Sequence, residues 1–132
     1  GYCWGTGTSG QLGDGFTLSR TSPGAVSGGL ILLTVSAGNF HTCGVTTASS
    51  PYCWGYNFYG SVGDGTQTQR AMPTAVSGGL IMSAVSAGQD FSCGVATGTV
   101  NVVYCWGRND LGQVGDGTIT NRLVPVRVAG QN

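Results

Sequence analysis

The sequence contains neither lysine nor glutamate, and its charged side chains are five arginines and five aspartates, which gives a formal net charge of zero. Only 8% of the 132 residues are charged, whereas an intrinsically disordered chain would need more charge. A nucleic-acid-binding surface would need a basic excess, which is lacking. The longest largely apolar run, residues 30–35, is far shorter than the roughly 20 residues of a membrane helix. We therefore expect neither nucleic-acid binding nor membrane insertion.

Strong helix formers are also scarce, while glycine is abundant. The chain has 25 glycines together with many valine, threonine and serine residues. Valine and threonine favour strands, and glycine and serine favour the turns between them. The composition predicts an all-β protein.

A threefold internal repeat is the main feature of the sequence. The motif Tyr-Cys-Trp-Gly begins at Tyr2, Tyr52 and Tyr104, which sets a period of 50 and then 52 residues. A Gly-Asp-Gly turn, an arginine and a proline follow each copy in the same order. Residues 25–31 recur letter for letter at positions 75–81. Repeats of this length indicate an array of similar structural units.

Apolar runs between glycine, proline and serine predict four short strands in each unit. In the first unit they cover residues 23–27, 31–37, 42–46 and 51–54. Four antiparallel strands in about 50 residues are typical of one β-propeller blade. This interpretation divides the chain into a fourth strand and inter-blade loop (1–22), a complete blade (23–55), a loop (56–72), a second blade (73–107), and a loop with the first strand of a third blade (108–132).

These motifs resemble the repeat of the regulator-of-chromosome-condensation family, in the version with paired cysteines found in bacterial secreted and surface proteins. The resemblance rests on Tyr-Cys-Trp-Gly, on Gly-Asp-Gly with its arginine and proline, and on Val-Ser-Ala-Gly before a cysteine, and it spans nearly the whole chain. It implies a seven-bladed propeller, which at this period would need about 350 residues. The chain holds about 2.6 units. We therefore expect a segment of a longer polypeptide, in which open blade edges also offer a route to self-association.

Residues that recur in every copy are expected to serve the unit rather than a single active site. Three sets recur: the tryptophans, the aspartates and the arginines. We interpret the tryptophans as packing anchors between blades, and each aspartate–arginine pair as a lock on its loop. Ligand stacking and calcium binding are the alternatives, although each loop offers at most two carboxylates. The sets are Trp4, Trp54 and Trp106; Asp14, Asp64 and Asp116; and Arg20, Arg70 and Arg122.

The five cysteines fall on two positions of the repeat. If the third and fourth predicted strands form a hairpin, the cysteines of each unit face one another across it, at a distance that suits a disulfide. We predict the pairs Cys43–Cys53 and Cys93–Cys105, with Cys3 unpaired or paired outside this segment. Zinc binding is disfavoured because the spacing has no C-x-x-C pair. Paired cysteines indicate an oxidising compartment, and so an extracellular or cell-surface protein.

Two further positions are interpreted by comparing the copies. The single histidine, His41, matches Phe91, which predicts a partly buried packing residue rather than a catalytic or metal-binding one. Asn57 and Asn109 match Gly7, which predicts a turn and argues against shared chemistry by the asparagine side chain.

The family that the sequence resembles houses exchange factors, enzyme inhibitors and surface adhesion modules, so that the fold does not fix the function. We expect a non-enzymatic structural or binding module, with a protein or glycan partner and without a cofactor or metal. The alternative is a protein inhibitor of a secreted enzyme. A guanine-nucleotide exchange factor is disfavoured by the paired cysteines and the zero net charge. A partner would bind where the copies differ, at residues 6–9, 56–59, 97–103 and 108–111, and the aromatic residues Tyr56, Phe58 and Tyr59 are the expected contacts.

Overall fold

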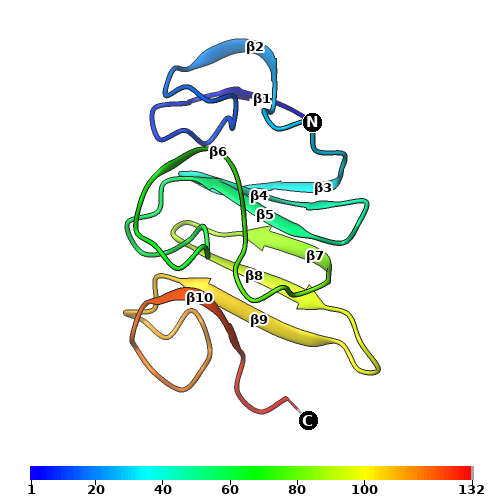
Figure 1. The fold of residues 1–132 in the computed structure, drawn as a ribbon. Coiled ribbons are helices and arrows are strands. Elements are labelled where there is room, and N and C mark those ends of the chain that lie inside the picture. Colours follow the sequence, from blue (N-terminus) through cyan, green and yellow to red (C-terminus); the bar gives the residue numbers. More distant parts are fainter. Residues whose placement is uncertain (132) are drawn as a thin grey trace.

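The computed structural model describes residues 1–131 and shows an all-β chain, with ten strands and no helix in that range. The sheets follow one another as stacked layers, with the two termini at opposite ends of the stack (Figure 1). The strands are β1 (Tyr2–Gly5), β2 (Arg20–Ala25), β3 (Leu32–Ala37), β4 (His41–Thr46), β5 (Pro51–Gly55), β6 (Arg70–Ala75), β7 (Met82–Ala87), β8 (Phe91–Ala96), β9 (Val102–Gly107) and β10 (Arg122–Arg127).

Every sheet is an antiparallel meander in which neighbours in sequence are neighbours in space. Two complete four-stranded sheets have the orders β3-β4-β5-β6 and β7-β8-β9-β10, and β1 pairs with β2 in a two-stranded sheet. Short turns join the first three strands of each complete sheet, and the longer loop with the Gly-Asp-Gly turn joins the third strand to the fourth. The predicted fold class, antiparallel four-stranded propeller blades, is confirmed.

The predicted blade boundaries are wrong by one strand. The strand that contains Pro23 is β2, and it pairs with the preceding β1 instead of opening the next sheet. In the same way Gly55 of β5 lies opposite Arg70 of β6. The loop with the Gly-Asp-Gly turn therefore joins two strands of one sheet, and residues 23–55 and 73–107 are not blades. The final segment, residues 108–131, completes the second full sheet through β10 rather than starting a third.

The crossing from one sheet to the next takes place at a pair of glycines. Gly28 and Gly29 both have positive φ angles, 91° and 63°, between β2 and β3. Gly78 and Gly79 repeat this conformation between β6 and β7, with φ angles of 97° and 61°. Because L-residues with side chains rarely adopt this backbone, the Gly-Gly pair is the residue signal for the sheet boundary.

The two predicted disulfides are present and fix the register of the central hairpins. Cys43 of β4 lies directly opposite Cys53 of β5, and their Cα atoms are 4.1 Å apart. Cys93 of β8 and Cys105 of β9 form the same bridge, with Cα atoms 4.0 Å apart. Cys3 is the one free cysteine among residues 1–131.

The core lies between the two complete sheets. Apolar side chains from both sheets and from the loop after β5 form one buried cluster, which consists of Cys43, Val45, Cys53, Val62, Val76, Met82, Val85 and Trp106. Both cysteines of the first disulfide belong to this cluster, so that the bridge is itself part of the interface between the sheets.

Two of the three tryptophans are the packing anchors that the repeat predicts. Trp54 and Trp106 are fully buried, and their indole N–H groups donate to the carbonyl oxygens of Gln11 (3.0 Å) and Ser61 (2.9 Å) in the loop of the preceding unit. A Cβ atom at Gly13 would come within 2.6 Å of the Trp54 Nε1 atom, so that the loop can approach the indole only with glycine there. Trp4 departs from the prediction and is 60% exposed, because the described residues include no preceding loop to cover it.

Candidate functional site

The aspartate of each Gly-Asp-Gly turn is held by the arginine six residues later. The Asp64 carboxylate accepts a bond from the Arg70 Nε atom at 2.7 Å and bonds from the backbone N–H and hydroxyl of Thr66. Asp116–Arg122 repeats this arrangement, Asp14–Arg20 repeats it without the hydroxyl bond because residue 16 is Phe16, and both ion pairs are at 2.5 Å. These contacts agree with the predicted role as loop locks and engage the carboxylates within their own loops.

The locks lower the pKa values of their aspartates. Hydrogen bonds from the Thr118 hydroxyl, Arg122 and the Thr118 backbone N–H lower the pKa of Asp116 to about 2. Burial acts to raise the pKa of Asp64, but hydrogen bonds from Thr66 and Arg70 outweigh it, so that the pKa is lowered. Carboxylates held in this ionised state are stable anchors for the turns and poor general acids at neutral pH.

Asn57 and Asn109 have a structural role that the comparison with Gly7 missed. Both side chains are fully buried. The Asn109 amide donates to the carbonyl oxygens of Thr118 and Thr120, both at 3.0 Å, and its Oδ1 accepts the backbone N–H of Val114 at 2.9 Å. Asn57 makes the equivalent contacts with its own loop. A separate bond is made by the backbone N–H at this position, which donates to the Ser19 hydroxyl in the first copy (from Gly7, 3.2 Å) and to the Asn121 Oδ1 atom in the third (from Asn109, 2.8 Å).

His41 is more deeply buried than predicted. It is 1% exposed because the second complete sheet covers it, and its Nε2 atom is 2.8 Å from the Ser92 Oγ atom. Burial lowers the pKa of His41 to about 4, and its Nδ1 atom has no hydrogen-bond partner among the described residues. The interpretation as a packing residue holds, but the position is a buried polar contact between sheets.

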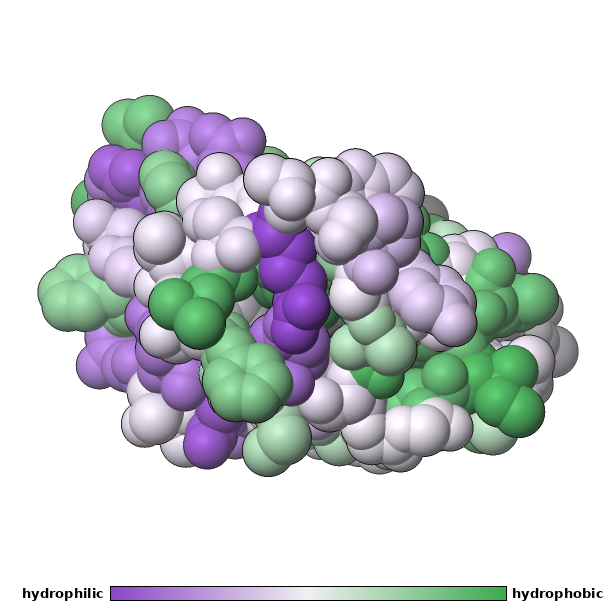
Figure 2. Space-filling model, turned by 90° about the horizontal axis from the view of Figure 1, so that it is seen from above, coloured by the Kyte–Doolittle hydropathy of each residue, from purple (hydrophilic) through white to green (hydrophobic). Residues whose placement is uncertain are grey.

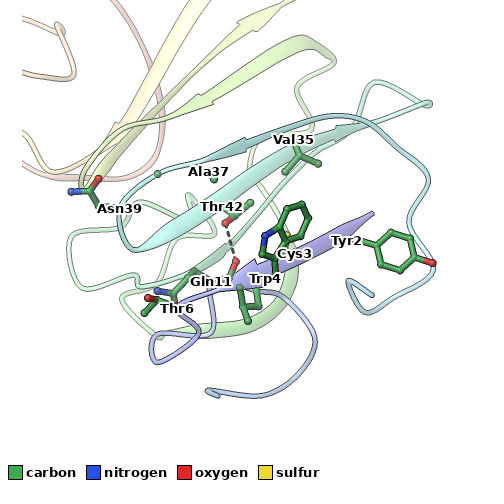
Figure 3. Close-up of a pocket in the computed structure, with 11 residues that line it drawn as sticks. Tyr2, Cys3, Trp4, Thr6, Gln11, Val35, Ala37, Asn39 and Thr42 are labelled. Carbon is green, nitrogen blue, oxygen red and sulfur yellow. Dashed lines mark hydrogen bonds between the residues drawn. The ribbon is translucent and has the colours of Figure 1, made fainter. Parts of the chain in front are cut away.

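A hollow lies beside the two-stranded sheet. It has a volume of about 420 Å³, and its lining includes Cys3, Trp4, Val35, Ala37 and Thr42. Figure 3 shows Cys3 and Trp4 of β1 on one side of this hollow, with Val35 and Ala37 of β3 on the other. In the two complete sheets, two further strands lie beside the strands that correspond to β1, namely β3 and β4 beside β5, and β7 and β8 beside β9. The hollow is therefore the uncovered edge of β1, and burial there raises the pKa of the Cys3 thiol.

The same end of the molecule carries exposed hydrophobic side chains. Seen from the β1–β2 end, hydrophobic residues gather toward the side where Figure 1 places the N-terminus and the β2–β3 connection (Figure 2). Exposed members of this part of the chain include Tyr2, Ile31 and Leu33. Ile81, the copy of Ile31 in the next unit, is also exposed (59%), and we assign these side chains no chemistry.

A second feature, the predicted aromatic cluster, lies on the loop after β5. Tyr56, Phe58 and Tyr59 contact one another, with ring centroids 5.1–6.4 Å apart. Phe40, from the turn between β3 and β4, extends the cluster with its ring centroid 6.1 Å from that of Tyr56. Phe58 is 58% exposed, whereas the two tyrosines are half-buried. The structure thus brings the three predicted residues together and adds Phe40.

A hollow of about 330 Å³ adjoins this cluster. Its lining consists of Ser9, Phe40, Tyr56, Tyr59 and Asp90. Asp90 lies in the turn between β7 and β8 and is 7% exposed. Arg108 completes the surroundings, with its guanidinium carbon 5.1 Å from the centre of the Tyr59 ring. Of the features described, this one combines aromatic side chains, charge and a cavity on loops, and we take it as the candidate binding site.

Other kinds of site find no support in the described residues. Within residues 1–131 no three histidine, cysteine, aspartate or glutamate side chains come together as a metal site. The same range contains no helix that could cross a membrane.

Sequence models of protein families show which family the chain belongs to. The model described as the regulator of chromosome condensation (RCC1) repeat matches residues 2–45, 52–95 and 101–132, and a second RCC1 repeat model matches residues 33–61. The chain belongs to the RCC1 repeat family. The first of these models leaves residues 46–51 and 96–100 of this RCC1 chain unmatched, around the connections from β4 to β5 and from β8 to β9. No curated protein matches the sequence.

Solved structures agree with the RCC1 assignment at the level of the fold. Prp20p from Saccharomyces cerevisiae superposes with a TM-score of 0.79 and 22% identity over 99% of this chain, and human WBSCR16 with a TM-score of 0.81 and 20% identity over 98%. Yeast RCC1 (Prp20) in complex with Kap60 gives a TM-score of 0.76 and 21% identity over 99% of this chain. The chain spans 34%, 35% and 32% of these three structures, about one third of each.

Proposed function

We propose that this RCC1-repeat chain is a non-enzymatic binding module of a secreted or cell-surface protein, and that it contacts a partner protein through the loops after β5 and β9. The observation that carries the proposal is that the residues that stabilise each repeat recur in every copy, whereas several loop residues differ between the copies. The tryptophans, turn aspartates and arginines recur in each copy, whereas Tyr56 is replaced by Thr6 and Arg108, and Tyr59 by Ser9 and Leu111. The differing side chains meet on the surface around the aromatic cluster.

The contacts of the titratable groups support a binding rather than an enzymatic role. Four of the five aspartates are paired with arginines in or next to their own loops. The single histidine is buried between sheets, with its pKa lowered to about 4 and a serine as its partner. General acid–base catalysis needs such groups close to a substrate and poised near the working pH.

The disulfides support an extracellular location. Two of the repeat units carry the same cross-strand bridge. Such bridges persist in oxidising compartments and are rare in the cytosol. This argument also disfavours the guanine-nucleotide exchange factor, a nuclear or cytosolic role.

Proteins of the same fold give a precedent for protein partners. The structural report on Prp20p describes its binding to Gsp1p and histones, and another structure shows Kap60 bound to yeast RCC1. At 21–22% identity these relatives support the fold, and we carry over only the class of partner, protein rather than glycan. An inhibitor of a secreted enzyme would be one such protein-binding role.

Site-specific photocrosslinking tests the proposal. A photoreactive phenylalanine analogue placed at Phe58 is expected to capture a defined protein in the native extracellular material. The same analogue at Ile81, which is 59% exposed in the connection between β6 and β7, serves as the control. Capture at position 58 that Tyr56→Thr abolishes would support the proposal, because the first copy carries Thr6 at that position. Equal capture at both positions, or none at position 58, would contradict it.

A further inference from the structure

The hollow beside the aromatic cluster has a carboxylate among its lining residues. Phe40, Tyr56 and Tyr59 contribute aromatic rings, and Asp90 contributes the only acidic group of the lining. The Asp90 side chain is only 9% exposed, so that most of its surface is withdrawn from water. A buried carboxylate needs a cationic or hydrogen-bonding partner to offset its lost hydration.

The protein itself supplies that partner incompletely. Arg108 binds Asp110 through two close contacts, Nε to Oδ1 at 2.9 Å and Nη2 to Oδ2 at 2.7 Å. Its remaining contact with Asp90, from Nη1 to Oδ2, is 3.5 Å long. Within the described residues no other cation forms an ion pair with Asp90. Two carboxylates therefore share one guanidinium, which leaves one negative charge at the hollow.

The rest of the chain does not compensate this charge. Three arginines are committed to the turn aspartates of their own loops. Arg127 donates to the carbonyl oxygen of Gln131 near the end of β10. The overall net charge of zero thus conceals a local excess of negative charge at the aromatic hollow.

The backbone holds the groups of this hollow in fixed positions. The carbonyl oxygen of Phe40 accepts the backbone N–H of Tyr56 at 2.9 Å, and the carbonyl oxygen of Asp90 accepts that of Arg108 at 2.9 Å. The same pair of repeat positions is therefore tied together in both complete sheets. Because these hydrogen bonds fix the backbone on both sides of the hollow, binding costs little conformational entropy of the loops.

From these observations we infer that the hollow binds a cationic side chain, an arginine or lysine presented by the partner protein; this inference rests on the proposed function. Aromatic faces attract a guanidinium or ammonium group through their quadrupole, and the Asp90 carboxylate pairs with its charge. Arg108 already stacks on Tyr59 in this way, which shows that the cluster accommodates a guanidinium. Two of the lining side chains, Tyr56 and Tyr59, are tyrosines. Tyrosine is enriched among the residues that contribute most to the binding free energy of protein interfaces.

A metal ion fits the hollow less well than a cationic side chain. Calcium requires six to eight oxygen ligands, roughly, and the lining offers one carboxylate and the hydroxyls of Ser9, Tyr56 and Tyr59. Aromatic rings contribute nothing to such a coordination shell, whereas they cover the apolar stem of an arginine or lysine.

A titration with small blocked amino acids tests the inference. We would record amide NMR spectra of the disulfide-intact protein while adding blocked arginine or, in parallel, blocked citrulline, its uncharged isostere. Arginine is expected to shift the resonances of Phe40, Tyr56, Tyr59 and Asp90, with an affinity roughly tenfold above that of citrulline. Blocked lysine is expected to act like arginine, and added salt to weaken both.

Two variants assign the effect to Asp90. Asp90→Asn is expected to reduce the affinity for arginine to that for citrulline, whereas Ile81→Ala, at an exposed residue of the connection between β6 and β7, should leave it unchanged. If Asp90→Asn fails to fold, Asp90→Phe replaces it, because the first copy carries Phe40 at this position.

The possible outcomes separate this inference from the proposed function. Equal affinity for arginine and citrulline, or no shift with either, would overturn the cation site. Crosslinking at Phe58 would still test the protein-binding role by itself. Capture there together with a failed titration would mean that a partner is bound without its cation entering the hollow.

Discussion

His41 of β4 and Ser92 of β8 are joined by a hydrogen bond across the interface between the two complete sheets, at 2.8 Å between Nε2 and Oγ. The Ser92 hydroxyl donates in turn to the carbonyl oxygen of Ser61, at 3.0 Å. Because that hydroxyl has a single proton, His41 must donate from Nε2, and its Nδ1 atom carries the lone pair. No group in the described structure pairs with Nδ1, so that a second proton on the ring would be buried without an acceptor.

This arrangement predicts an acid-sensitive sheet interface. The pKa of His41 is about 4 in the folded protein, against 6.5 for the ordinary group, so that the unfolded chain binds the proton first as the pH falls. As the pH is lowered from 6.5 to about 4, the free energy of unfolding should decrease by on the order of 3 kcal/mol in total. Urea unfolding at a series of pH values measures this change.

His41→Phe is the matched variant, because Phe91 holds the same position in the second copy. It removes the titrating group, so that the decrease over this pH range should disappear. A wild-type stability that does not change between pH 6.5 and pH 4 would contradict the burial of a neutral His41.

The tryptophans provide a second prediction, because identical residues occupy different environments. Trp54→Ala removes a fully buried indole and its hydrogen bond to Gln11, and it should lower the free energy of unfolding by about 3–5 kcal/mol. Trp4→Ala changes an exposed side chain and should alter it by about 0.5 kcal/mol or less. Thermal unfolding of both variants compares them. Equal losses would show that the indoles are not the anchors of the sheet stack.

Asn109 provides a third prediction about the loop after β9. Asn109→Ala leaves the backbone N–H of Val114 and two carbonyl oxygens without their partner, and the cost should be about 1–3 kcal/mol. Asn39→Ala, at an exposed asparagine, is the control and should be close to neutral. Hydrogen exchange of the Val114 amide should become faster in the first variant alone. Unchanged exchange would contradict the bond to Asn109.

The loop locks provide a fourth prediction, for strongly acidic solution. The pKa of Asp116 is lowered from 3.8 to about 2, so that its contribution to stability is complete above pH 3.8 and disappears as the pH falls toward 2. Carbon-13 NMR of the carboxyl group should show a midpoint near pH 2. Arg122→Gln should raise this midpoint, whereas Arg127→Gln should not. A midpoint near 3.8 in the wild type would contradict the lock.

Much of the fold could be predicted from the sequence because the repeat supplies internal comparisons. Cys43 and Cys53 recur at matching positions, so that a hairpin and its disulfide followed from their spacing. The phase of the sheets was missed because periodicity defines the length of a unit and not where it begins. The Gly28–Gly29 pair, with two positive φ angles, marks the boundary between sheets, whereas the predicted boundary lay at the loop with the Gly-Asp-Gly turn.

The candidate site was predictable only in part. Tyr56, Phe58 and Tyr59 are neighbours in sequence, and their differences from the other copies are visible in it. Phe40 and Asp90 join them from turns of two different sheets, which requires knowledge of how the sheets stack. The buried roles of Asn57 and Asn109 were hidden because the first copy has Gly7 at this position, where a Cβ atom would clash with the Leu18 carbonyl oxygen, so that the loop closes there without an asparagine side chain.

Disulfide mapping of the protein isolated from its native source, without reduction, tests the central claim most directly. The account predicts peptides that join Cys43 to Cys53 and Cys93 to Cys105, because these pairs fix the register of the central hairpins and belong to an oxidising compartment. Bridges between other cysteines would contradict the register. A fully reduced protein from that source would contradict the extracellular module.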